Sequence, residues 1–178
     1  MNSIDISQFN LGQTKTMNSP SDGPQDCVAL IVSAGRGHRF GGEIPKQYLK
    51  LGGRSLLAHS IDKLQSHPRI GRMRAVIHPD DQDLYTAASS GLNLLEPVFG
   101  GAERQYSVRL GLESMAEFKP KYILIHDAVR PFIDHDTLDL LFASLEAGKS
   151  GVIPGVLVAD TLKRSADNLI SDTEIGRA

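Results

Sequence analysis

The sequence has a single cysteine, Cys27, and no tryptophan. One cysteine cannot build a disulfide framework or a cysteine cluster for zinc. The six histidines show no spacing typical of metal ligands. The chain also lacks a G-x-S-x-G motif, and Cys27 precedes the first apolar segment, so the residues give no support for hydrolysis through a serine or cysteine nucleophile.

Long apolar runs and strong charge are missing as well. No run approaches the roughly 18 residues that a membrane-spanning helix needs, and the N-terminus lacks the basic-then-apolar pattern of a signal peptide. The formal net charge of -2 gives no support for nucleic-acid binding. We therefore expect a cytoplasmic protein with neither a membrane nor a nucleic acid as partner.

The 178 residues, 40% of them hydrophobic, suffice for one domain with a sizeable core. Residues 1–26 are polar and rich in Ser, Asn, Gln, Gly and Pro, which predicts a disordered leader before a domain at 27–178. Within that domain, strand-type and helix-type segments alternate. We expect strands at 28–32, 72–78, 94–99, 121–126 and 152–158, and helices at 55–64 and 104–116. Two more helices are expected, one capped by Asp80 or Asp81 and running through residue 88, the other capped by Asp134 or Asp136 and running through residue 147.

This alternation predicts an α/β fold: a Rossmann-like, mainly parallel sheet with helices on both faces. In such sheets ligands bind at the carboxyl ends of the strands. The loop after the first strand is glycine-rich and basic, with Gly35 and Gly37 accompanied by the cations Arg36, Arg39 and Lys46. Because glycines let backbone N–H groups approach an anion, this loop is typical of polyphosphate binding.

Two familiar phosphate motifs do not match this loop. The dinucleotide fingerprint requires a glycine where the chain has Phe40, and the P-loop requires a lysine where it has Glu43. An ordinary turn with solvated basic residues is the alternative interpretation. What favours binding is that Arg39 and Lys46 occur together, with Pro45 immediately before the lysine.

Asp127 is the clearest carboxylate candidate, because it follows a buried-type strand in the segment His126-Asp-Ala-Val-Arg-Pro131. A carboxylate there could hold Mg²⁺ against nucleotide phosphates. The alternative is a turn or capping aspartate. His126 and Asp127 are neighbours in an extended segment, so they point to opposite faces and form no catalytic dyad.

Four segments in order resemble the 2-C-methyl-D-erythritol 4-phosphate cytidylyltransferases, which are nucleotidyltransferases of sugar and polyol phosphates. They are Pro45-Lys-Gln-Tyr-Leu49, Gly100-Gly-Ala-Glu-Arg-Gln-Tyr-Ser107, His126-Asp-Ala-Val-Arg-Pro131 and Asp160-Thr-Leu-Lys-Arg164. The chain departs from the family at Ala102, where an acidic residue thought to meet the ribose is usual. That weakens one expected ribose contact.

The resemblance implies transfer of CMP from CTP to 2-C-methyl-D-erythritol 4-phosphate with release of pyrophosphate, in isoprenoid precursor biosynthesis. It implies transition-state contacts from Arg39 and Lys46, and Mg²⁺ held by Asp127. It also implies two binding sets. The nucleotide would be bound by Ser33, Ala34, Gly35, Gly37, Gly101, Ser107 and Ala128, and the acceptor by Arg130, Thr161 and Arg177.

The end of the sequence carries a further expectation. Residues 158–175 have extended-type residues on both sides of a turn-like Ser165-Ala-Asp-Asn168, which predicts a hairpin. An isolated hairpin is marginally stable in water, and the resemblance implies a protruding arm that joins two subunits in a homodimer. Family members continue past this chain's last residue, so we expect the domain at 27–178 to be incomplete at its C-terminus. Some members are fused to the cyclodiphosphate synthase of the same pathway.

Two alternatives to this function stay open on the sequence. One is a cytidylyltransferase for another polyol phosphate, such as ribitol phosphate. The other is a nucleotide-binding module without activity, for which Ala102 and the early end are the hints.

Overall fold

The computed structural model describes residues 25–36, 44–101, 103–156, 162–166 and 169–175. The chain divides into two compact units, Met1–Asp134 and His135–Ala178. Each is described by itself. The predicted leader falls almost wholly outside the described residues.

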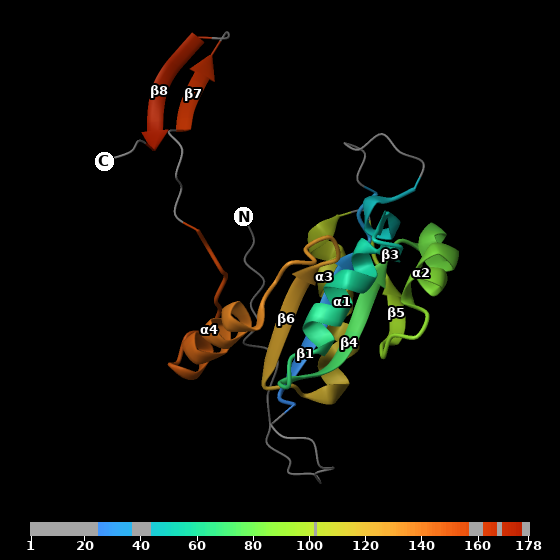
Figure 1. Ribbon diagram of the computed structural model, residues 1–178. Helices are drawn as coiled ribbons and strands as arrows, with labels where there is room; N and C mark the ends of the chain where they lie inside the picture. Colours follow the sequence, from blue (N-terminus) through green and yellow to red (C-terminus); the bar gives the residue numbers. More distant parts are fainter. Residues whose placement is uncertain (1–24, 37–43, 102, 157–161, 167–168, 176–178) are drawn as a thin grey trace. The chain divides into compact units, whose positions relative to one another are not determined.

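The first unit is built on a four-stranded sheet in which every pairing is parallel (Figure 1). Its strand order is β5-β4-β1-β6. The strands are β1 (Cys27–Ser33), β4 (Ile70–Ile77), β5 (Leu95–Phe99) and β6 (Tyr122–Asp127). Val32 pairs with Val76 on one side and with Asp127 on the other, so the carboxyl ends of β1, β4 and β6 lie side by side. The predicted parallel sheet is confirmed.

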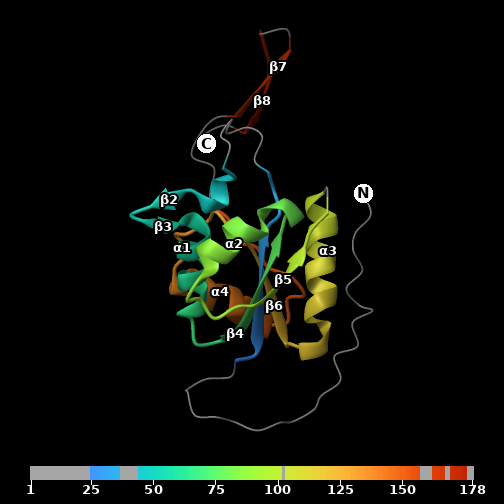
Figure 2. The same ribbon diagram turned by 90° about the vertical axis from the view of Figure 1, so that its right-hand side faces the viewer.

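Helices cover both faces of this sheet. Figure 2 shows α1 and α3 on opposite sides of the strands. The α-helices are α1 (Leu56–Gln65), α2 (Gln82–Ser89) and α3 (Arg104–Met115), and the short 3-10 turns are η3 (Lys46–Tyr48), η4 (Pro79–Asp81) and η5 (Ala116–Phe118). Ser55 caps α1, because its side chain accepts a hydrogen bond from the Ala58 N–H at 3.1 Å. Each α-helix of this unit matches a segment predicted from the sequence.

The core lies between β1 and the helices on either face. Leu30 and Ile31 are completely buried, as expected for a strand covered on both sides. On one face α1 contributes buried Leu57, Ile61 and Leu64. On the other, Gly111 of α3 lies so close to β1 that an added Cβ would be 2.6 Å from the δ carbons of Leu30. Glycine therefore sets how closely α3 approaches the sheet.

A small hairpin between η3 and α1 was not predicted from the sequence. It pairs β2 (Lys50–Leu51) with β3 (Arg54–Ser55) in antiparallel fashion. Gly52 and Gly53 connect the strands with φ angles of 59° and 87°, which glycine adopts without strain. The Gly-Gly dipeptide between extended residues was the available signal.

The second unit contains α4 (His135–Glu146) and an antiparallel hairpin of β7 (Leu162–Ala166) and β8 (Leu169–Ile175). The hairpin was predicted, but Ser165 and Ala166 belong to β7 rather than to the turn. The strand expected at 152–158 is wrong over 152–156, which have no regular structure, and its last two residues lie outside the described ones. Pro154 and Gly155 interrupt the apolar run, and both disfavour a strand interior.

No helix among the described residues is long and apolar enough to cross a membrane.

Candidate nucleotide-binding site

The carboxyl ends of β1 and β6 open onto a pocket of about 380 Å³. The chain leaves β1 to build β4 and β5 on one side and then returns to place β6 on the other. This reversal of strand order is where open α/β sheets bind ligands, because the flanking loops part there. The lining residues are Val32, Ser33, Ala34, Gly35, Lys46, Gln47, Gly101, Glu103, Arg104, Ser107, Asp127, Ala128 and Val129.

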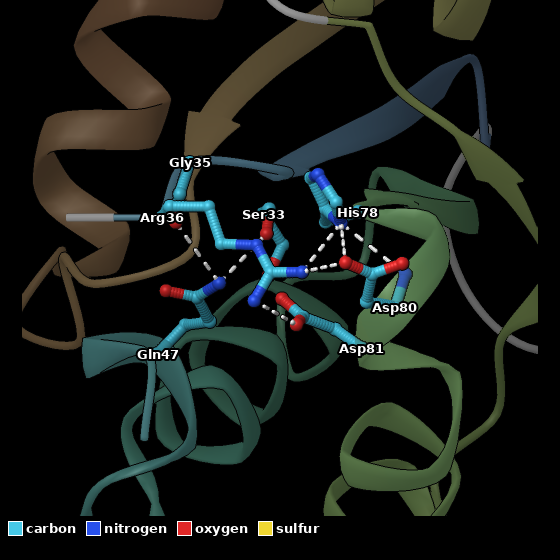
Figure 3. A network of polar contacts seen from close by, with 7 residues as sticks. All are labelled: Ser33, Gly35, Arg36, Gln47, His78, Asp80 and Asp81. Carbon is cyan, nitrogen blue, oxygen red and sulfur yellow. Dashed lines mark hydrogen bonds and ion pairs between the residues drawn. The ribbon is translucent and has the colours of Figure 1, made fainter. Parts of the chain in front are cut away.

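The first wall of the pocket is the segment Ser33–Gly35, directly after β1. The buried side-chain amide of Gln47 donates to the Ser33 carbonyl at 2.8 Å and to the Gly35 carbonyl at 3.3 Å (Figure 3). Lys46, the first residue of η3, also lines the pocket. The Pro-Lys-Gln-Tyr segment therefore has two parts here: its lysine faces the pocket and its glutamine holds the backbone of the glycine loop.

The second wall joins the loop after β5 to the start of α3. The Gly101 N–H donates to the Ser107 hydroxyl oxygen at 3.1 Å, and the hydroxyl donates to the Glu103 carbonyl at 3.0 Å. At Gly100, an added Cβ would lie 2.6 Å from the Cβ of Ala34. The two walls touch at this point, so residue 100 has room for glycine alone.

Asp127 lies at the end of β6, between two arginines. Its Oδ1 accepts from Arg104 Nη2 and its Oδ2 from Arg130 Nε, both at 2.9 Å. Partial burial raises the pKa of Asp127, but the hydrogen bonds and charges of Arg104 and Arg130 together outweigh it and hold the pKa below its usual value. Asp127 is therefore a carboxylate at neutral pH.

The loop after Asp127 is held in place by backbone and side-chain hydrogen bonds. The Ala128 N–H donates to the Val32 carbonyl at 3.1 Å, and the Ser60 hydroxyl donates to the Ala128 carbonyl at 2.9 Å. His126 Nε2 lies 3.0 Å from the Arg130 carbonyl, to which a neutral imidazole donates. Burial lowers the pKa of His126, which favours that neutral form.

The structure brings most of the predicted site residues into one place. Around the pocket lie Ser33, Ala34, Gly35, Lys46, Gly101, Ser107, Asp127 and Ala128. Arg130 is exposed and contacts Asp127 without lining the pocket. Gly37, Arg39, Thr161 and Arg177 lie outside the described residues. The roles of all these residues in binding and catalysis stay predictions.

Sequence reasoning missed Gln47, Glu103 and Arg104 as pocket residues. Their signal was present, since Gln47 stands in the Pro-Lys-Gln-Tyr segment and Arg104 in the glycine-serine segment. Arg36 was counted among the loop cations available to a polyphosphate. In the structure its guanidinium contacts Asp80 and Asp81 instead.

Comparison with known proteins agrees with this geometry. The family model of IspD, described as 2-C-methyl-D-erythritol 4-phosphate cytidylyltransferase, matches residues 27–177. The bifunctional enzyme IspD/IspF of Paramagnetospirillum magneticum is 55% identical over 146 residues, and that of Rhodospirillum rubrum 55% over 147. Each match covers 82% of this chain and 38% of the relative. The chain thus spans well under half the length of these bifunctional enzymes.

A solved structure of 4-diphosphocytidyl-2C-methyl-D-erythritol synthase is similar in fold as well. It matches with a TM-score of 0.70 at 28% sequence identity, over 86% of this chain and 69% of that protein. The family match over residues 27–177 contains all four segments that carried the resemblance in the sequence. This chain belongs to the IspD family, the 2-C-methyl-D-erythritol 4-phosphate cytidylyltransferases.

Proposed function

We propose that this protein transfers CMP from CTP to 2-C-methyl-D-erythritol 4-phosphate and releases pyrophosphate. The observation that carries the proposal is the pocket between β1 and β6, where a glycine loop, a lysine and a carboxylate converge within a chain of this family. The proposed place of the reaction is the synthesis of isoprenoid precursors.

The reaction needs little covalent help from the protein. A phosphate oxygen of the acceptor attacks the α-phosphorus of CTP, a new P–O bond forms, and the bond to the β-phosphate oxygen breaks. The acceptor phosphate is already anionic at neutral pH, so no general base is required. Charge develops on the transferring group and on the pyrophosphate, and fixed positive groups stabilise it.

Most of the predicted site residues, in the pocket and outside it, have a proposed part in this chemistry. The backbone N–H groups of Ala34 and Gly35 face the triphosphate, and Lys46 neutralises charge that develops in transfer, together with Arg39. Gly101 and Ser107 bind the nucleoside, with Ala128 beside it. Arg130, Thr161 and Arg177 bind the acceptor phosphate. Because the pocket holds both reactants in one orientation, it removes much of the entropic barrier.

Asp127 is the proposed ligand for Mg²⁺. The described residues contain no cluster of three or more His, Cys, Asp or Glu side chains that could form a complete cage. A single carboxylate nevertheless suits magnesium, which takes one or two carboxylates and completes its shell with substrate phosphates and water. Each oxygen of Asp127 accepts one arginine hydrogen bond and retains a further lone pair. When bound, Mg²⁺ neutralises phosphate charge and orients the phosphates.

The hairpin of β7 and β8 is the proposed arm of a homodimer. Two strands alone are marginally stable, so the hairpin gains stability if it packs on a second surface. In the proposed dimer the arm carries Thr161 to the acceptor site of the partner.

Pyrophosphate release by the full-length protein tests the function. CTP should be compared with ATP, GTP and UTP, and methylerythritol phosphate with ribitol phosphate. We expect release with CTP and methylerythritol phosphate, and loss of that signal in the Lys46→Ala variant. Release with ribitol phosphate but not with methylerythritol phosphate would transfer the proposal to the other acceptor.

A further inference from the structure

Arg36 links the glycine loop to a loop of the neighbouring strand. It directly follows Gly35, and its side chain reaches the segment after β4, as Figure 3 shows. There Arg36 Nη2 donates to Asp80 Oδ2 at 2.5 Å and to His78 Nδ1 at 2.9 Å. Arg36 Nη1 lies 3.6 Å from Asp81 Oδ1. One guanidinium thus contacts three residues of a loop 42 or more positions away in sequence.

Two carboxylates of unlike exposure hold this guanidinium. The Asp80 side chain is 72% exposed, whereas that of Asp81 is 1% exposed. Among the described residues, Asp81 Oδ2 has no hydrogen-bond partner. A buried carboxylate is costly without a nearby positive charge, and Arg36 supplies one. The charge of Asp81 is also felt at Tyr48 of η3, where burial first and Asp81 second raise the pKa of the phenol to about 12.

The glycine loop is therefore held on two sides. On one side Gln47 engages the carbonyls of Ser33 and Gly35. On the other, the side chain of the next residue, Arg36, is fixed by Asp80, Asp81 and His78. His78 is fixed in turn, since its Nδ1 also accepts from the Asp80 N–H at 3.2 Å. The segment between these anchors, Ser33–Gly35, lines the pocket.

We propose that Arg36 is a positioning residue: clamped by Asp80, Asp81 and His78, it holds the Ser33–Gly35 backbone in the shape that binds the nucleotide triphosphate. This inference rests on the proposed function of the pocket. The opposing possibility is that Arg36 leaves the carboxylates and contacts the phosphates itself. If Arg36 is a clamp, Asp80 helps CTP to bind because it holds Arg36 in place. If Arg36 contacts the phosphates, Asp80 competes with them for the guanidinium.

Two single variants and their combination separate the clamp from a phosphate ligand. Arg36→Lys keeps a positive charge beside buried Asp81 but loses the planar fork that reaches several groups. Asp80→Ala removes the exposed carboxylate and leaves Arg36 in place. The clamp predicts that each raises the KM for CTP by roughly tenfold to a hundredfold, as small misplacements of binding groups do. The double variant should raise the KM for CTP no more than the more strongly affected single variant, because both substitutions break the same contact.

The control is Arg54→Ala, which removes another ion pair of an arginine and an aspartate, Arg54–Asp62, between β3 and α1. It should keep the parent values of KM and kcat. The KM for the acceptor should stay unchanged in every variant. An Asp80→Ala variant that binds CTP more tightly than the parent would overturn the clamp in favour of phosphate contact by Arg36.

Hydrogen exchange of the apo protein tests the clamp without any reaction. Peptides that contain Ala34, Gly35 and Arg36 should exchange faster in Arg36→Lys and in Asp80→Ala than in the parent and in Arg54→Ala. If exchange is faster in the two variants while the parent shows no turnover, the clamp stands and the proposed function is contradicted. Unchanged exchange in both variants would overturn the clamp, whatever the protein catalyses.

Discussion

Lys46 lines the pocket at the start of η3, next to the glycine loop. Lys46→Ala should lower kcat by about a hundredfold to a thousandfold, since removal of one transition-state contact in a dry site costs roughly 3–4 kcal/mol. The resemblance gives the same expectation for Arg39→Ala. Pyrophosphate release gives kcat, and thermal unfolding should show a small change. Near-parent turnover in either variant removes that residue from the mechanism.

Asp127→Asn tests the magnesium ligand. The amide keeps the shape of the side chain but removes the charge, so activity should fall and half-maximal activity should need more Mg²⁺. A magnesium titration of pyrophosphate release measures both effects. Asp62→Asn, at an exposed ion pair of α1, is the control and should leave the titration unchanged. If Asp127→Asn gives the parent curve, Asp127 is a turn residue that pairs two arginines.

His126 gives a pH dependence of stability. Its pKa in the folded protein is lowered by burial, so the unfolded state takes up the proton first as the pH falls. The stability that neutral His126 contributes is complete above a pH of about 6.5, the usual pKa of histidine. It is lost as the pH falls toward the lower pKa that His126 has in the folded protein. His126→Gln keeps a donor for the Arg130 carbonyl but does not titrate. Denaturant unfolding at a series of pH values should show a shallower loss below about 6.5 in this variant, and equal slopes would contradict the assignment.

At the scale of elements, the packing of α3 against β1 depends on the absence of a side chain at Gly111. Gly111→Ala would gain up to about 1 kcal/mol in helix propensity. The new methyl group would meet both δ carbons of the completely buried Leu30 at 2.6 Å and Val76 at 2.8 Å. Overpacking in a core costs roughly 1–3 kcal/mol, so we expect net destabilisation in denaturant unfolding.

A second substitution checks the cause of that destabilisation. Leu30→Val removes the two δ carbons that the new methyl group would meet at the shortest distance, so it should cost less in the Gly111→Ala background than in the parent. Gln105→Ala, at an exposed position of α3, is the control for helix propensity and should be neutral or slightly stabilising. A stabilised Gly111→Ala variant would mean that the sheet and α3 can separate at low cost.

At the scale of the whole molecule, the proposed dimer makes each active site from two chains. Light scattering should give twice the chain mass. A mixture of inactive Lys46→Ala and inactive Thr161→Ala chains should recover part of the activity, because one hybrid site has both groups intact. Lys46→Ala mixed with Asp127→Asn should recover none, since both changes lie in the same pocket. A monomer, or mixtures that stay inactive, would contradict the shared site and leave the nucleotide pocket untouched.

Local patterns in the sequence were enough for most of the fold. The continuous apolar run of β1 predicts a strand covered on both faces, because the apolar side chains that point to each face are stabilised by burial. Ser55 before an apolar helical pattern predicts the start of α1. The order of strands and helices then leaves a parallel sheet as the simplest arrangement. The family segments, read in order, pointed to pocket residues of η3, α3 and β6.

Partnerships over long sequence distance were decided by the tertiary structure. Arg36 is a basic residue in a glycine-rich loop on paper, and only the register of β1 and β4 brings it to Asp80 and Asp81. From the sequence, Asp127 is an ordinary carboxylate. In the folded protein Arg104, 23 residues earlier at the start of α3, donates a hydrogen bond to it and helps to lower its pKa. Glycine at 100 and at 111 leaves room for side chains of other segments, Ala34 at residue 100 and Leu30 and Val76 at residue 111. Such contact between segments distant in sequence is a property of the packed fold.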